Sequence, residues 1–208
     1  MPRAVQADAL AKTILSATAS LIEDEGVDAL TMRAVATRAS YSPTAIYLVF
    51  KNKKELLEAT VVRMRALLIE ELMREEISDD LAVYLNRVGV RFVRWGVQNP
   101  NGYRLLFEQR DGQPAFTTVA ALQSDVWSGD RDVTERVFAN ELSRYPDPAG
   151  IVDLAWATLH GIVWLAITGQ LGPVGANVTE RAARLAATFA SLALGASESP
   201  TTEPDTSG

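Results

Sequence analysis

The residues most able to do chemistry in this chain are cations gathered near its N-terminal end. Residues 29–54 contain five basic side chains and no acidic one, although the whole chain of 208 residues has a net charge of −6. The five are Arg33, Arg38, Lys51, Lys53 and Lys54. Because lysine and arginine bind phosphate, this window indicates a nucleic-acid contact on an otherwise acidic protein. Arg33 and Arg38 could also be ordinary solvated charges.

Two predicted helix starts lie between these cations. Thr31 is a candidate N-cap for a helix over residues 32–38, and Ser42 followed by Pro43 predicts the start of a second helix. Residues 39–41 form the short turn between them. Small alanines on the first helix allow the two helices to cross closely, which is typical of a helix-turn-helix motif.

A third helix start carries two of the cations. Asn52 and Glu55 have the spacing of a capping box, which predicts a helix beginning at Asn52. Lys53 and Lys54 then lie in the first turn, where positive charge opposes the helix dipole. A phosphate bound at that helix end would make their position favourable, since backbone N–H groups and both ammonium groups would contact it.

The same region carries an ordered motif between residues 14 and 56. It comprises Ile14-Leu15-x-Ala17, Leu21-Ile22, Glu25-Gly26, Leu30-Thr31-Met32-Arg33-x-Val35-Ala36, Ala39-Ser40-Tyr41-Ser42-Pro43-Thr44-Ala45-Ile46-Tyr47 and Phe50-x-Asn52-Lys53-x-Glu55-Leu56. In order and spacing, this motif resembles the TetR family of transcriptional regulators. The resemblance implies a three-helix DNA-binding domain followed by a larger helical domain that dimerises and binds an effector.

The resemblance also implies roles for individual residues. Ser42, Pro43 and Thr44 would face base edges, and the Tyr47 hydroxyl would bind a phosphate. Thr31 and the helix start at Lys53 would contact the DNA backbone, while Tyr41 could either pack or reach DNA. Together with the nearby cations, the predicted DNA-binding residues are Thr31, Arg33, Tyr41, Ser42, Pro43, Thr44, Tyr47, Lys51 and Lys53.

Two features depart from the pattern of the family. Ser40 stands in the turn where glycine is usual, and a left-handed serine there would cost roughly 1 kcal/mol. Leu48 and Val49 follow Tyr47 where many members have polar residues, which removes a possible phosphate contact. Tyr47 and Phe50 could both be core residues; we expect Phe50 in the core and Tyr47 facing phosphate.

Apolar residues recur at helical spacing along most of the chain, and no segment alternates strictly. This predicts an all-α fold of about nine helices. We expect a helix-turn-helix DNA-binding domain over 1–53, a helical effector-binding and dimerisation domain over 54–194, and a disordered tail over 195–208. Helical stretches are predicted over 81–95, ending before a turn at 99–102, over 151–169 and 178–194, and as patches over 116–126 and 133–143.

Residues 154–179 carry no formal charge, and this stretch is long enough to be considered as a membrane span. Its polar residues and the lack of a flanking basic cluster favour a buried helix instead, so we expect a soluble, cytoplasmic protein without a membrane contact. The helices over 151–169 and 178–194 are the predicted homodimer surface, the second being rich in alanine. The alternative is that they pack only within their own subunit.

An aromatic set in the C-terminal part is the candidate effector site. Trp156, His160 and Trp164 recur at helical spacing on one face, and the stretch Leu154 to Gly161 resembles a helix of one TetR subfamily with a Trp-His-Gly motif. The predicted effector-binding residues are Phe92, Trp95, Tyr103, Phe107, Trp127, Trp156, His160 and Trp164, with Phe116 nearby. The alternative is that these aromatic residues form ordinary core.

The residue inventory argues against catalysis. The chain has no cysteine and one histidine, and it lacks glycine-rich phosphate loops, so we expect no enzyme, cofactor or metal site. The predicted function is a dimeric repressor that binds a palindromic DNA operator and is released by a small apolar or aromatic effector. The alternative is a helical small-molecule-binding or scaffold protein whose helix-turn-helix does not bind DNA.

Overall fold

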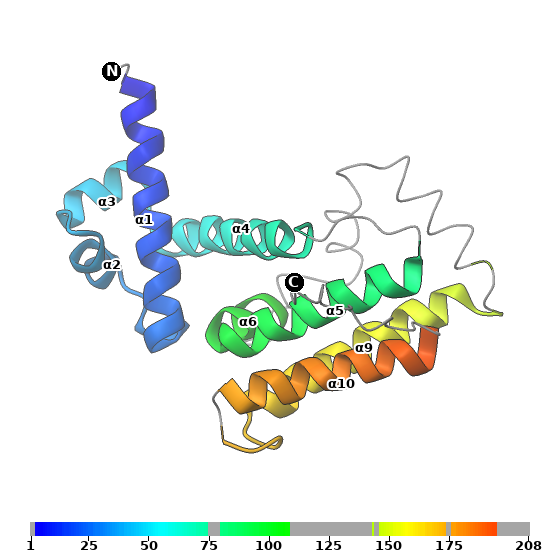
Figure 1. Cartoon of the computed structure of the whole chain (residues 1–208). Helices are drawn as coiled ribbons and strands as arrows, with labels where there is room; N and C mark the ends of the chain where they lie inside the picture. Colours follow the sequence, from blue (N-terminus) through cyan, green and yellow to red (C-terminus); the bar gives the residue numbers. More distant parts are fainter. Residues whose placement is uncertain (1–2, 75–79, 109–142, 144–145, 174–175, 195–208) are drawn as a thin grey trace, which may run out of the picture. The chain divides into compact units, whose positions relative to one another are not determined.

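The computed structural model describes residues 3–74, 80–108, 143, 146–173 and 176–194. Within these residues the chain is helical and has no strand, which confirms the all-α fold. Figure 1 shows the helices, which are α1 (Arg3–Glu25), α2 (Met32–Ala39), α3 (Pro43–Val49), α4 (Lys53–Leu72), α5 (Leu81–Gln98), α6 (Pro100–Phe107), α9 (Pro148–Ile167) and α10 (Ala176–Leu194), with a short 3-10 turn, η1 (Val27–Ala29). The predicted patches at 116–126 and 133–143, and the predicted tail, lie outside the described residues.

Helix α1 is the central element of the N-terminal region. Helices α2, α3 and α4 each pack against it, and α2 also packs against α3 (Figure 1). The core between them consists of aliphatic side chains that are almost fully buried, among them Ile14 and Ile22 of α1, Val35 of α2 and Ile46 of α3. Their burial from water supplies the main stabilisation of this small assembly.

The three predicted N-caps are confirmed. Thr31 Oγ1 accepts a hydrogen bond from Ala34 N at 3.0 Å, and Ser42 Oγ accepts one from Ala45 N at 3.2 Å. Asn52 Oδ1 accepts one from Glu55 N at 2.9 Å. Each cap gives a partner to a backbone N–H that the first turn of a helix leaves unpaired, so these residues define where the three helices begin.

The segment after α5 differs from the expected turn. Helix α5 ends at Gln98, and α6 begins at Pro100, so the junction between two helices is the single residue Asn99. Pro100 occupies the first position of α6, where its missing N–H removes no helical hydrogen bond. The turn-forming residues 99–102 therefore start a second helix that periodicity did not reveal.

The chain divides into two compact units. One holds α1 to α4, the end of α5 from Arg94, and α6; the other holds α5 up to Val93, together with α9 and α10. The predicted functional boundary between residues 53 and 54 coincides with the start of α4 and stays a prediction.

Helices α9 and α10 pack against each other in the second unit. Small side chains, among them Ala166 of α9 and Ala182, Ala186 and Ala190 of α10, are buried there and allow close approach of helices. None of the helices in the described residues is long and apolar enough to cross a membrane.

Candidate nucleic-acid interface

The second helix of the helix-turn-helix, α3, has one buried and one exposed face. Ile46 is fully buried and Phe50, just after the helix, is also in the core, as expected. Pro43, Thr44, Tyr47 and Leu48 lie on the exposed face, Tyr47 with 54% of its surface accessible. The N-cap at Ser42 sets the start of the helix and therefore sets which side chains point outward.

The turn before α3 holds Ser40 in the left-handed conformation, with φ 59° and ψ 36°. Ser40 N donates to Thr37 O at 3.2 Å, and Tyr41 N donates to Ala36 O at 3.0 Å, which together close the end of α2. Ser40 therefore adopts the left-handed conformation at the position where the family usually has glycine. Tyr41 is exposed at this turn and is not a core residue.

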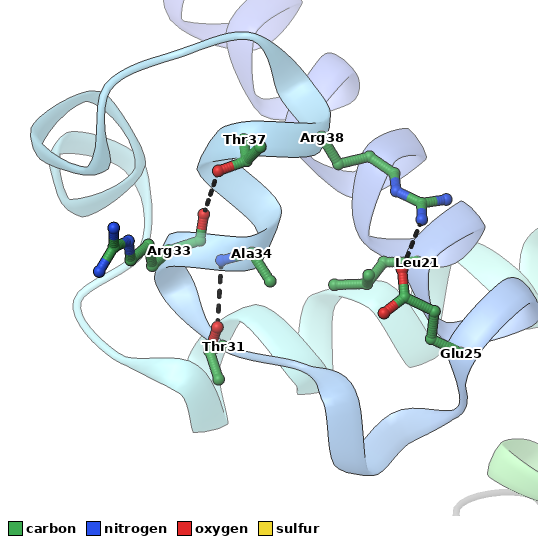
Figure 2. Close-up of a pocket in the computed structure, with 7 residues that line it drawn as sticks. All are labelled: Leu21, Glu25, Thr31, Arg33, Ala34, Thr37 and Arg38. Atoms are coloured by element: carbon green, nitrogen blue, oxygen red, sulfur yellow. Dashed lines mark hydrogen bonds and ion pairs between the residues drawn. The ribbon is translucent and has the colours of Figure 1, made fainter.

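The two arginines of α2 point in different directions. Arg33 and Arg38 border a hollow of about 440 Å³ between α1 and α2, which is lined by Leu21, Glu25, Thr31, Arg33, Ala34, Thr37 and Arg38. Figure 2 shows Arg38 reaching toward Glu25, while Arg33 points away from it. Arg33 is exposed, whereas Arg38 is partly covered.

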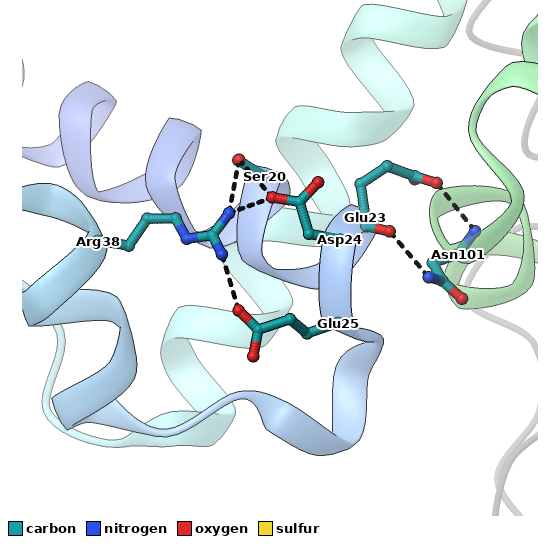
Figure 3. A network of polar contacts seen from close by, with 6 residues as sticks. All are labelled: Ser20, Glu23, Asp24, Glu25, Arg38 and Asn101. Carbon is teal, nitrogen blue, oxygen red and sulfur yellow. Dashed lines mark hydrogen bonds and ion pairs between the residues drawn. The ribbon is translucent and has the colours of Figure 1, made fainter.

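Arg38 is bound to the end of α1. Its Nη1 donates to Ser20 Oγ at 3.0 Å and is paired with Asp24, and its Nη2 donates to Glu25 Oε1 at 2.7 Å (Figure 3). The hydrogen bond to Asp24 raises the pKa of Arg38 above its already high usual value, so the guanidinium is charged and held by carboxylates. Its charge is neutralised within the fold, in contrast with that of Arg33.

The start of α4 presents the lysines. In a capping box the Glu55 carboxylate would accept a hydrogen bond from the backbone N–H of the N-cap, Asn52. Here it accepts one from Lys51 N instead, at 2.8 Å, one residue before the N-cap. Lys51 and Lys53 are exposed, and Lys54 Nζ lies 3.9 Å from Glu58 Oε1. Two ammonium groups are therefore available beside a helix N-terminus, an arrangement suited to a phosphate.

Helix α1 is also hydrogen-bonded to the start of α6, through a contact that the sequence did not predict. Glu23 Oε2 accepts a hydrogen bond from Gly102 N at 2.9 Å, and Glu23 Oε1 accepts one from Asn101 N at 3.2 Å, so Glu23 caps the start of α6. Asn101 Nδ2 returns a hydrogen bond to Glu23 O at 2.8 Å (Figure 3). A Cβ on Gly102 would lie 3.1 Å from Glu23 Oε2 and 2.6 Å from Met64 Cε, so the glycine permits this close approach.

Two family models match this chain. The one described as bacterial regulatory proteins, tetR family, matches residues 14–60, and the one described as tetracyclin repressor-like, C-terminal domain, matches residues 85–189. The second match alone covers 105 of the 208 residues. The chain belongs to the TetR family. It is therefore a DNA-binding transcriptional regulator, and the exposed helix-turn-helix is the part of this TetR regulator that carries the family's DNA-binding motif.

Solved structures share the fold of this TetR-family chain. SmeT, the repressor of the Stenotrophomonas maltophilia multidrug efflux pump SmeDEF, is 24% identical in its triclosan complex, with 89% of this chain and 91% of SmeT covered and a TM-score of 0.60. A TetR-like regulator from a Rhodococcus species is 21% identical, with 95% and 100% covered and a TM-score of 0.59. FadR, the fatty acid degradation regulator of Bacillus halodurans, is 13% identical, with 86% and 93% covered and a TM-score of 0.60. None of the curated proteins compared with the chain matches it.

The predicted effector residues of this TetR regulator fall in different parts of the structure. Phe92, Trp156, His160 and Trp164 belong to the unit of α9 and α10, whereas Trp95, Tyr103 and Phe107 belong to the unit of α1 to α4. Tyr103 and Phe107 contact each other with ring centroids 5.1 Å apart. Trp127 and Phe116 lie outside the described residues. The predicted set is thus divided between the two units.

The first group is a compact ring cluster. The Phe92 centroid lies 5.7 Å from that of Trp156 and 5.1 Å from that of His160, and the Trp156 and His160 centroids are 4.2 Å apart. Burial lowers the pKa of His160 to about 4, so the imidazole is neutral at physiological pH. Trp164, one turn beyond His160, is 43% exposed and lies outside this cluster. The Trp-His-Gly subfamily assignment stays a prediction.

Proposed function

We propose that this TetR-family regulator is a homodimeric repressor whose α2–α3 surface binds a palindromic operator. The observation that carries the proposal is the exposed, capped α3 with cations on either side of it and with the neighbouring Arg38 neutralised by α1. Among the described residues, Arg33, Lys51 and Lys53 make no ion pair, so their charges remain available for phosphate.

The contacts expected at this surface follow from the chemistry of each group. Arg33, Lys51 and Lys53 would neutralise phosphates, and the Tyr47 hydroxyl would donate to one. The Thr31 oxygen already accepts from Ala34 N, which leaves its hydroxyl proton free to donate to a phosphate. At the exposed start of α3, Ser42, Pro43 and Thr44 would face base edges, and the exposed Tyr41 ring would reach DNA.

Selection of bound genomic fragments, followed by gel-shift titration at several salt concentrations, tests DNA binding. We expect a salt-sensitive complex on the selected fragment and a weaker one on a scrambled fragment. Tyr47→Phe and Lys53→Ala should each weaken both complexes by about tenfold, because a phosphate contact contributes to every sequence alike. The matched control is Lys12→Ala, which removes the same charge from an exposed lysine paired with Asp8 on α1.

Absence of any sequence-selective complex, even at low salt, would overturn the proposal and favour a helical binding or scaffold protein. A loss in Tyr47→Phe or Lys53→Ala that is confined to certain base sequences would contradict their phosphate role. An equal loss in Lys12→Ala would show that the effect of Lys53→Ala reflects net charge alone.

Dimerisation is supported by apolar side chains that α9 and α10 leave exposed. They are Leu154, Trp164 and Leu165 on α9 and Leu185 and Leu192 on α10, the last with 82% of its surface accessible. A second copy of these two helices would cover them and form a four-helix seam. Two linked DNA-binding heads would then reach successive major grooves, about 34 Å apart.

Sedimentation equilibrium checks the proposed dimer. Trp164→Glu combined with Leu192→Glu should shift the protein toward monomer, because buried unpaired carboxylates oppose association. The control is Val62→Glu, an equally drastic change at an exposed apolar residue of α4. If the double variant remains dimeric and Val62→Glu becomes monomeric, the dimer interface does not lie on α9 and α10.

An apolar or aromatic effector is supported by the Phe92–Trp156–His160 ring cluster. A neutral imidazole beside aromatic rings offers no charge to pair with an anion, and the apolar ring surface suits an uncharged ligand. Such a ligand would release DNA if it bound more tightly to a dimer conformation in which the distance between the two DNA-binding domains does not match the operator.

Triclosan, the ligand of the SmeT complex, is a suitable first probe. It should quench tryptophan fluorescence and dissociate the operator complex, and Phe92→Ala should weaken both effects. Val62→Ala, which changes an exposed apolar residue of α4, should alter neither ligand affinity nor DNA release. If triclosan and a panel of other apolar and aromatic compounds all leave the operator complex intact, the effector part of the proposal is wrong, whereas the DNA-binding part stands.

A further inference from the structure

Helix α3 lacks the side chains that usually identify bases. Its seven residues are Pro-Thr-Ala-Ile-Tyr-Leu-Val, with no arginine, lysine, asparagine, glutamine or carboxylate among them. In the major groove, guanine is recognised by paired hydrogen bonds from arginine or lysine, and adenine by paired hydrogen bonds from asparagine or glutamine. Helix α3 can make neither kind of contact, so any selectivity it has must come from hydroxyl groups and apolar surface.

The most exposed apolar side chain of the helix-turn-helix is Leu48, which is 80% accessible. Thr44 lies one turn before it and Tyr47 lies beside it, on the side of α3 opposite the fully buried Ile46. Leu48 therefore contributes almost nothing to the core. Its exposure on the same side of α3 as Thr44 and Tyr47 leaves it accessible to DNA bound at that side.

The exposed cations of the α2–α3 surface lie outside α3 itself, so the exposed face of α3 carries no charge. Arg33 is on α2, and Lys51 and Lys53 follow α3 at the start of α4. Phosphate contacts from such positions hold the protein on DNA in a fixed orientation without reading sequence. Base recognition by α3 is then left to the hydroxyl group of Thr44 and to apolar surface, of which Leu48 is the most exposed large side chain.

Resting on the proposed DNA-binding role of this surface, we propose that Leu48 reads the C5-methyl group of a thymine in each operator half-site. The thymine methyl is the one apolar group that a base pair presents in the major groove. Contact with Leu48 removes both groups from water, whereas cytosine or guanine at that position would leave the leucine against a polar base edge. The half-site contacted by α3 therefore contains at least one thymine recognised through its methyl group.

Deoxyuridine substitution in the selected operator isolates this contact, because uracil differs from thymine only by the missing methyl group. Each thymine is replaced in turn, and affinity is measured at fixed salt. One thymine position in each half-site should lose about fourfold in affinity on replacement, and about 15-fold when both half-sites are changed together. The other thymines should tolerate uracil.

Protein variants connect the methyl group to Leu48. In Leu48→Ala the sensitive position should accept uracil without further loss, whereas Leu48→Met, which keeps an apolar surface, should retain the discrimination. Both variants should keep the helical circular dichroism spectrum, since Leu48 is outside the core. Val62→Ala, at an exposed apolar residue of α4, is the matched control and should discriminate as the unmodified protein does.

The outcomes separate this inference from the proposed function. Tight, salt-sensitive operator binding that tolerates uracil at every position overturns the methyl contact and leaves DNA binding intact. A uracil effect that persists unchanged in Leu48→Ala overturns the role of Leu48. Failure of the unmodified protein to select any DNA contradicts the proposed function itself, and this inference with it.

Discussion

Arg38 of α2 holds Glu25 at the end of α1 through a hydrogen bond of 2.7 Å between Nη2 and Oε1. The same guanidinium also binds Ser20 and Asp24, so the first helix of the helix-turn-helix is joined to α1 through one side chain (Figure 3). Arg33, five residues earlier on the same helix, is exposed. The two arginines of this basic window thus differ in role. Arg38 fixes the orientation of α2 against α1, whereas Arg33 is exposed and accessible to DNA.

Arg33→Ala should reduce the salt dependence of operator binding, whereas Arg38→Ala should leave it nearly unchanged. Each phosphate contact contributes about 0.9 to the slope of log K against log salt, so losing Arg33 from both subunits should lower the slope by about 2. Gel-shift titrations over a range of salt concentrations measure the slope. Arg38→Ala should instead lower the melting temperature, and a slope change equal to that of Arg33→Ala would contradict its assignment.

Ser40→Gly should stabilise the protein by about 0.5–1 kcal/mol. Ser40 has a φ of 59°, a conformation that is strained for a residue with a Cβ and unstrained for glycine. The gain is smaller than the full strain because glycine also has more freedom in the unfolded chain. Urea unfolding measures the change; Ser40→Ala, which keeps the Cβ, is the control and should show no gain. A loss of stability in Ser40→Gly would contradict the proposed strain.

Glu23→Ala should destabilise the protein by about 1 kcal/mol, the usual contribution of a helix cap. The Glu23 carboxylate accepts from Asn101 N and Gly102 N, and its removal leaves both N–H groups at the start of α6 without it. Glu23→Gln retains one acceptor oxygen and should lose less. The control is Glu70→Ala on α4, which breaks only an exposed pair with Arg63 and should change stability little. Equal losses in Glu23→Ala and Glu70→Ala would refute the capping role.

His160 should make stability depend on pH below neutrality. Burial lowers its pKa from 6.5 to about 4, so between these values the unfolded chain binds a proton that the folded chain does not. Stability is therefore full above about pH 6.5 and falls as the pH drops toward 4, by about 2–3 kcal/mol in total. Because His160 is the sole histidine of the chain, urea unfolding between about pH 5 and pH 7.5 reports mainly on this group.

His160→Phe keeps an aromatic ring in the cluster and removes the titrating group. Its free energy of unfolding should lack the fall between neutral pH and pH 5, whatever its absolute stability. If the variant keeps the same pH slope as the unmodified protein, another group causes the dependence, and the neutral buried imidazole is refuted.

Much of the DNA-binding head was predictable from sequence because its defining interactions are local. Thr31, Ser42 and Asn52 each bond a backbone N–H three residues later, so residue type and spacing suffice to predict the cap and the helix start. The left-handed turn at Ser40 was expected from the resemblance to the TetR family, in which glycine is usual at that position. The junction at Asn99 was not, because a proline after a helix is compatible with both a turn and a new helix.

The amino-acid sequence by itself determined the all-α fold, the three capped helices and the basic, acid-free window around them. The tertiary structure alone decided which cation is free and which is held, and which residues meet across long separations. Glu23 and Asn101 are 78 positions apart, and Phe92 meets His160 from another helix. Periodicity shows which face of a helix is buried, but the partner of that face depends on how separate helices pack.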